Sequence, residues 1–331
     1  MDGLYLLWWV QEKQMSPALV AATMAAGDLL LMALEVPTGW FADRFGNRHS
    51  LILGSVLQVA GMICCWLADG IPGLVGACLL VAVADAFRSG ADQALLYRTC
   101  VAIGREPEFQ RIEARSRAVQ VVVLAALIVA GGAVVTRWGF TAGWLAETTL
   151  CALGGVVAVA MIEPPASDDE TEQDDGSERR ASVPWRMVAL LILPLAFLDA
   201  AGSTGSFLLQ TTGERSAAAV TLLVALITLS NAVGSALATR LPAVGIRGQL
   251  SVAAAGALIA TVALIVPAAL VPATIALSFG TGVLHPLRAT AIQRLATDGV
   301  RARTASAANA CDMALSTLCL LLAGNFLSRK R

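Results

Sequence analysis

The chain has 331 residues, of which 57% are hydrophobic and 14% charged, and its mean hydropathy is +0.71. Soluble domains carry about 25% charged and about 45–50% apolar residues, so this composition excludes water as the solvent for most of the chain. The formal net charge of −1 gives no sign of nucleic-acid binding, and we expect membrane lipids to be the surroundings instead.

Apolar runs long enough to cross a bilayer follow one another along the chain. A transmembrane helix needs about 20 mostly apolar residues, and a partial run, Met1–Val10, precedes the first complete one. We therefore predict an all-α polytopic membrane protein with about ten full transmembrane helices. They lie at residues 17–39, 50–69, 71–93, 116–136, 141–162, 186–208, 217–240, 249–269, 271–293 and 304–327.

Basic residues indicate on which side of the membrane each loop lies. Fifteen arginines occupy alternate loops, whereas the opposite loops hold only Lys13, Arg137 and Arg215, apart from the C-terminal tail. Because basic residues gather on the cytoplasmic side, we expect residues 40–49 and 163–185 to be cytoplasmic. The prediction is a multi-pass protein of the cell inner (cytoplasmic) membrane.

The segment 163–185 separates two halves of the chain. It contains the acidic run Asp168–Asp175, which cannot bury apolar surface and is typical of a solvated linker. We expect an N-terminal transmembrane bundle at 1–162, the linker at 163–185, and a C-terminal transmembrane bundle at 186–331.

A weak internal repeat supports this division. Asp85–Arg88 aligns with His285–Arg288 at an offset of 200 residues, and Phe45–Arg48 aligns with Val244–Arg247 at an offset of 199. Parallel repeats of this kind are found in transporters built from two similar bundles.

The segment Gly39–Arg48 reads Gly-Trp-Phe-Ala-Asp-Arg-Phe-Gly-Asn-Arg between two apolar runs. It resembles the signature loop of the major facilitator superfamily, which joins helices 2 and 3 on the cytoplasmic side. The resemblance implies two bundles of the major facilitator type that provide alternating access, with this loop as a conformational latch. A loop that only sets topology would need the arginines, but neither the glycines nor the aspartate. The implied latch residues are Glu35, Gly39, Asp43, Arg44, Gly46 and Arg48.

Two further segments are similar to a drug-exporter-like branch of that family. They are Glu35–Gly39 and Ser89–Tyr97, although Gln93 and Arg98 stand where the branch has acidic residues. The similarity implies a secondary active transporter of a small organic molecule, with proton-coupled efflux. The alternatives are a proton-coupled importer of a nutrient and a truncated, non-transporting membrane protein. The truncated form is considered because alignment on the signature loop leaves most of helix 1 and all of helix 12 unaccounted for.

Ionisable residues inside the predicted spans are candidates for substrate and proton handling. A charge at the bilayer centre costs at least about 2.5–3.5 kcal/mol, so each needs a partner or a cavity. We expect Asp85, Arg88 and Asp92 to share one face of the span 71–93, because they are spaced i, i+3 and i+7. In the resembled family, helices 1, 4, 7 and 10 line the central cavity. The candidates are Asp28, Asp85, Arg88, Asp92, Asp199, His285 and Arg288.

Permanent ion pairs between helices are the alternative interpretation of these charges. Asp312, also inside a span, is expected to be an interhelical hydrogen-bonding group. Only two histidines, His49 and His285, occur in the chain, and its seven cysteines show no metal-ligand spacing. We therefore expect no enzyme activity, metal or cofactor. The intramembrane acids and the family resemblance together imply protons as the coupling ion, and we expect a monomer as the functional form.

Overall fold

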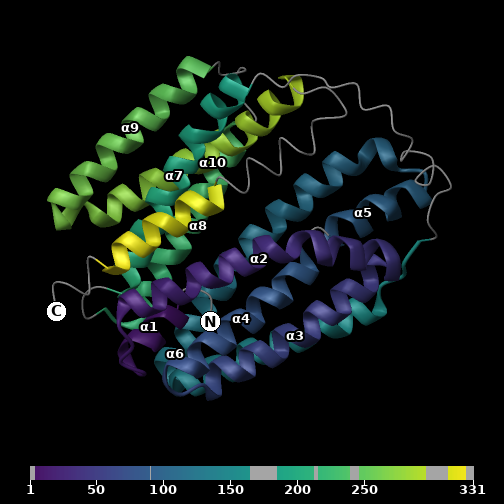
Figure 1. Cartoon of the computed structure of the whole chain (residues 1–331), viewed down its shortest axis with the longest axis horizontal. Helices are drawn as coiled ribbons and strands as arrows, with labels where there is room; N and C mark the ends of the chain where they lie inside the picture. The colour runs from purple at the N-terminus through teal and green to yellow at the C-terminus, as the bar shows by residue number, and fades with distance from the viewer. Residues whose placement is uncertain are drawn as a thin grey trace. The chain divides into compact units, whose positions relative to one another are not determined.

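The computed structural model describes residues 4–89, 91–164, 185–211, 215–238, 246–295 and 312–325, and every element within them is a helix (Figure 1). The first half contains α1 (Tyr5–Gln11), α2 (Pro17–Phe45), α3 (Asn47–Leu67), α4 (Gly70–Arg88), α5 (Ala91–Ala102), η1 (Glu106–Glu108) and α6 (Phe109–Ala160). The second half contains α7 (Trp185–Thr211), α8 (Ala217–Ala238), α9 (Ile246–Ile265), η3 (Pro267–Ala269), α10 (Leu270–Leu295) and a last helix, Asp312–Asn325.

The number of membrane-capable helices differs from the predicted ten. In the described part of the chain, seven helices are long and apolar enough to cross a membrane, and Arg247–Ala263 and Asp312–Asn325 are shorter apolar helices. Part of the difference arises in α6, which contains two of the predicted spans in one element of 52 residues. Gly139 breaks its helical geometry with φ = 82° and ψ = 172°, so two helices meet there at a kink with no separate loop between them.

Two predicted boundaries in the N-terminal half are also wrong. The expected loop 40–49 is helical up to Phe45, and Gly46 alone separates α2 from α3. Conversely, the expected span 71–93 ends at Arg88, because Ser89 adopts a non-helical conformation (φ = −58°, ψ = 122°). Asp92 consequently lies in the first turn of α5 and does not continue the face of α4 that carries Asp85 and Arg88.

The helices form two compact units. One comprises Thr23–Gln120 and Ala133–Gly176, and the other comprises Asp2–Ala22, Val121–Gly132 and Ser177–Arg331. The second unit therefore includes α1 and the first turns of α2, which come from the N-terminal half of the sequence. The predicted limits of the linker, between residues 162 and 163 and between residues 185 and 186, stay a prediction.

Close backbone approach holds α3 against α4 in the first unit (Figure 1). A Cβ atom added at Gly54 would lie 3.0 Å from the Ala84 carbonyl oxygen, and one at Gly61 would lie 2.8 Å from a methyl carbon of Val81. The Ser50 hydroxyl also donates a hydrogen bond to the Phe87 carbonyl at 2.6 Å. Small residues at such contacts are the usual means of helix association in a membrane, where lipid is as apolar as the helices themselves.

The second unit uses the same means between α8 and α10. The Asn231 side chain donates to the Ser278 carbonyl at 3.2 Å, and the Ser278 hydroxyl donates to the Ile227 carbonyl at 3.0 Å. Gly234 and Gly282 sit where any Cβ would collide with the backbone of the opposite helix. These contacts fix the position of α10, which carries two of the predicted site residues.

Helix ends from the N-terminal half are tightly packed within this second unit. α1 is in contact with α7 and is buried from Leu6 to Val10. An added Cβ at Gly324 would lie 2.7 Å from the Ala21 methyl group, and one at Gly132 would collide with Thr221. All of these contacts lie toward the ends of the helices that the loop charges predict to be non-cytoplasmic.

Candidate functional site

A glutamate from the end of α6 caps the N-terminus of α3. The two Glu163 carboxylate oxygens accept hydrogen bonds from the backbone N–H groups of Asn47 at 2.7 Å and Arg48 at 2.9 Å. The first N–H groups of a helix have no partner within it, and a negative charge there also interacts favourably with the helix dipole. Glu163 thus supplies both the missing acceptors and a favourable charge.

Gly46 makes room for this carboxylate. Its φ of 97° lies in a region that residues with side chains avoid. A Cβ atom at this position would also lie 2.9 Å from the Glu163 carboxyl carbon. Both observations favour glycine at this position, and the latch role implied for Gly46 stays a prediction.

Two arginines surround Glu163 in the same unit. Arg98 of α5 lies 3.7 Å from a Glu163 oxygen, with both side chains 20% exposed. The Arg48 guanidinium donates to the Val159 carbonyl near the end of α6 at 2.6 Å. The N-terminus of α3, the C-terminus of α6 and α5 are therefore held together in one polar cluster, which we call the Glu163 cluster.

The remaining predicted latch residues lie outside this cluster. Arg44 is exposed and stacks on Trp40, with 5.6 Å between the guanidinium carbon and the ring centroid. Glu35 and Gly39 are exposed on α2, and nothing lies within 4 Å of a Cβ added at Gly39. Gly39 lies within the continuous helix α2, and the latch role implied for it stays a prediction. The side chain of Asp43 lies outside the described residues.

A second polar cluster lies within the C-terminal unit. Arg288 of α10 donates from Nη1 to both carboxylate oxygens of Asp312, at 2.9 and 2.6 Å. These side chains are 5% and 17% exposed. Asp199 of α7 accepts a hydrogen bond from the Ser316 hydroxyl at 3.3 Å. Since Asp312 and Ser316 are one turn apart, the last helix links α7 to α10, and we call these four residues the Arg288 cluster.

The charges of the Arg288 cluster do not balance. It contains two carboxylates and one guanidinium, and the guanidinium directs two hydrogen bonds at Asp312. Within the described residues, no cationic side chain forms an ion pair with Asp199. His285 lies on α10 one turn before Arg288, is exposed and interacts electrostatically with Asp312; it is counted as neutral here. The cluster therefore has a formal charge of −1 when both acids are ionised.

The structure thus brings together two of the seven predicted substrate and proton candidates, Asp199 and Arg288, and places His285 nearby. The other four belong to the first unit. Asp85 and Arg88 form an ion pair within α4 at 3.7 Å, with both side chains 48% exposed. Asp28 is partly buried on α2, and Asp92 is exposed on α5.

The sequence of this chain matches the model of one protein family over nearly its whole length. The family model described as Major Facilitator Superfamily matches residues 3–318. The chain belongs to the major facilitator superfamily. It is accordingly a secondary transporter of the membrane rather than an enzyme, as the sequence predicted.

Solved structures of other transporters share this major facilitator fold. A crystal structure of the peptide transporter POT aligns with a TM-score of 0.70 at 15% identity, covering 97% of this chain and 84% of that one. A D-xylose-proton symporter aligns with a TM-score of 0.67 at 12% identity, covering 97% and 83%. The nucleoside transporter NupG aligns with a TM-score of 0.63 at 13% identity, covering 97% and 84%. Among curated proteins, none matches the sequence.

Three residues of this major facilitator protein have contacts that the sequence does not predict. Glu163 lies at the start of the predicted linker, and its role as the cap of α3 is not apparent from the sequence. The one signal is that it follows an apolar run directly, where an acidic side chain can reach the end of a neighbouring helix. Asp312 was expected to bond between helices, which is confirmed, but its partner Arg288 was not identified. Ser316 gave no signal, since a hydroxyl in a transmembrane helix commonly bonds to its own backbone.

Proposed function

We propose that this protein exports a small organic cation across the cytoplasmic membrane in exchange for protons. The observation that carries the proposal is the unbalanced charge of the Arg288 cluster. The similarity of Glu35–Gly39 and Ser89–Tyr97 to the drug-exporter-like branch supports the direction of transport.

The cluster gives a physical reason for exchange. The hydrogen bond of Asp199 comes from a neutral hydroxyl, and Arg288 acts on it only through space while pairing directly with Asp312. A carboxylate without an ion pair of its own is costly inside a membrane. Either a proton on a carboxylate or a cationic substrate beside it would remove that cost. Because the two compete for one negative charge, binding of one favours release of the other, which is the requirement for antiport.

The Glu163 cluster supplies the coupling to conformational change. In a major facilitator protein working by alternating access, the cytoplasmic ends of helices separate and reassemble. The cap on α3 joins α3, α5 and α6 at the end that the loop charges predict to be cytoplasmic. We expect these three helices to move as one piece.

Proton flux in reconstituted vesicles tests the proposal. The protein is incorporated into liposomes that contain a pH-sensitive dye, a pH gradient is imposed, and ethidium or tetraphenylphosphonium is added as the cationic probe. We expect the probe to drive proton movement in the opposite direction. Asp199→Asn should abolish the coupled proton flux, because the variant lacks the charge for which probe and proton compete.

The matched control is Glu108→Gln, which removes one carboxylate charge far from the cluster in sequence. Glu108 pairs with Arg105 on the exposed segment between α5 and α6, where its hydrogen bonds raise the pKa of that guanidinium. This variant should transport normally. Proton movement in the same direction as the probe would identify an importer. Unchanged coupling in Asp199→Asn would refute the assignment of the cluster.

A further inference from the structure

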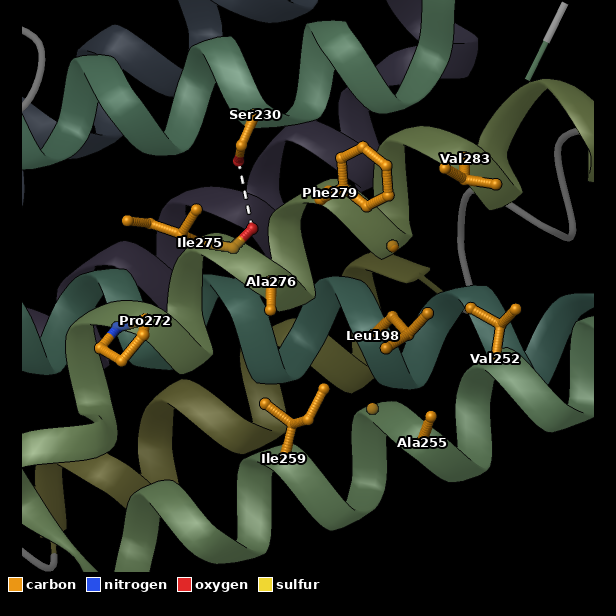
Figure 2. A pocket seen from close by; sticks show the side chains of 12 residues that line it. Leu198, Ser230, Val252, Ala255, Ile259, Pro272, Ile275, Ala276, Phe279 and Val283 are labelled. Atoms are coloured by element: carbon orange, nitrogen blue, oxygen red, sulfur yellow. Dashed lines mark hydrogen bonds between the residues drawn. The ribbon is translucent and has the colours of Figure 1, made fainter. Parts of the chain in front are cut away.

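A large apolar cavity lies among four helices of the C-terminal unit, apart from the Arg288 cluster. Its volume is about 610 Å³, and its walls come from α7, α8, α9 and α10. Figure 2 shows Leu198 of α7 and Ile259 of α9 pointing toward it, with Ile275 and Phe279 on the α10 side. The residues of α10 that line it are spaced i, i+3, i+4, i+7, i+8 and i+11 from Pro272 to Val283. Arg288 faces away from this side of α10, because five further residues rotate it by about 140°.

The chemistry of the walls selects an apolar occupant. The only polar side chain among the lining residues is that of Ser230. Its hydroxyl lies 2.8 Å from the Ile227 carbonyl and 3.2 Å from the Ile275 carbonyl, the latter drawn as a dashed line in Figure 2. A buried water needs about two to four polar partners, and the lining side chains offer one at most, the Ser230 oxygen as an acceptor. Water is therefore a poor occupant.

The two halves differ at positions that bring helices together in the first unit. At the repeat offset of 199 residues, α3 corresponds to α9, and Gly54 and Gly61 correspond to Ala253 and Ala260. The glycines let α3 approach α4 closely, whereas each alanine of α9 adds a methyl group. Small residues permit the closest approach of helices, so the two glycine positions that tighten the contact of α3 with α4 are not repeated in α9.

The cavity also has the length of one membrane leaflet. From Pro272, near the start of α10, to Val283 the helix rises about 16 Å, and the hydrocarbon of one leaflet is about 15 Å deep. The loop charges place the start of α10 at the outer face of the membrane. Leu258 and Val262 of α9 are 65% and 43% exposed, as expected of side chains facing lipid tails. We propose that this cavity binds one acyl chain of a lipid from the outer leaflet.

Photochemical labelling of the full chain tests the proposal. The protein is reconstituted in vesicles of phosphatidylethanolamine and phosphatidylglycerol that contain a phospholipid with a diazirine in the middle of one acyl chain. After illumination, labelled peptides are mapped by mass spectrometry. We expect adducts on Val252–Ile259 and Pro272–Val283 in excess over those on the exposed face of α8 at Leu222 and Leu226.

Variants that fill the cavity give the decisive comparison. Ala276→Leu and Ala255→Phe place side chains into it from α10 and α9, and each should reduce the cavity adducts about tenfold, the effect of losing roughly two buried methylene groups. Ala254→Phe, on the neighbouring exposed position of α9, should leave them unchanged and controls for folding.

Two results would overturn the proposal. The first is labelling that is equal on the cavity and on exposed helix faces, which would show only general contact with lipid. The second is loss of the cavity adducts when a transported cation is added, which would make the cavity part of the substrate route. The proposal does not depend on proton coupling, so a failed flux assay would leave it standing.

Discussion

The cap on α3 makes a quantitative prediction for Glu163→Gln. The carboxylate accepts two backbone hydrogen bonds, at 2.7 and 2.9 Å, and a hydrogen bond to a charged group contributes about 1.5–3 kcal/mol. The amide keeps one acceptor oxygen, but it turns an NH2 group toward the other N–H. The partly exposed pair with Arg98 adds less than about 1 kcal/mol. We therefore expect a loss of about 2 kcal/mol, which corresponds to about a 30-fold change in an equilibrium constant.

Amide hydrogen exchange measures this loss where it occurs. The N–H groups of Asn47 and Arg48 are the ones that Glu163 protects, so their exchange should accelerate about 30-fold in Glu163→Gln if opening of the cap exposes them. The Glu108→Gln variant, with the same change of charge, should leave them unaffected. Unchanged exchange in Glu163→Gln, or equal acceleration in both variants, would refute the assignment of the cap.

Other predictions concern the Arg288 cluster and the glycines of the signature segment. Asp312→Asn should lower the thermal stability of the detergent-solubilised protein strongly, because breaking a buried pair costs about 3–5 kcal/mol. The double variant Asp312→Leu with Arg288→Met should recover stability, because apolar residues replace both members of the ion pair, but it should not recover transport. A double variant as unstable as Asp312→Asn would contradict the ion pair between Arg288 and Asp312. Gly46→Ala should be destabilised by at least about 1 kcal/mol, since an alanine is strained at a positive φ. Gly39→Ala should be neutral or stabilising by about 0.5–1 kcal/mol, since Gly39 is helical and a methyl group there meets nothing. Thermal unfolding curves of the two glycine variants check both statements, and the reverse order would show that the turn lies at Gly39.

The sequence predicted the fold class because its signal is strong and local. Long apolar runs and few charges define transmembrane helices without knowledge of tertiary contacts, and the family follows from one short segment. The ends of helices were harder to predict. Trp40, Phe41 and Phe45 are apolar enough to continue α2, so the charged residues among them did not end the helix.

The candidate site was predicted only in part, for a different reason. Inside a membrane a charged residue is conspicuous, so Asp199 and Arg288 could be selected from the sequence alone. Their partners depend on which helices are neighbours, and Asp312 lies 24 residues beyond Arg288 on the next helix. Asp92 shows the limit of periodicity, because α4 ends at Arg88 with a non-helical Ser89 after it, and Asp92 belongs to the next helix, α5.

The distance in sequence between α3 and its cap has a consequence for how the protein is made. Glu163 follows Asn47 by 116 residues, and ribosomes add about 5–20 residues per second, so α3 enters the membrane roughly 6–23 s before its cap is synthesised. During that interval its first N–H groups must be satisfied by water at the membrane surface or by lipid headgroups. Completion of α6 then displaces these temporary partners, so the end of α3 reaches its final state only when α6 is in place.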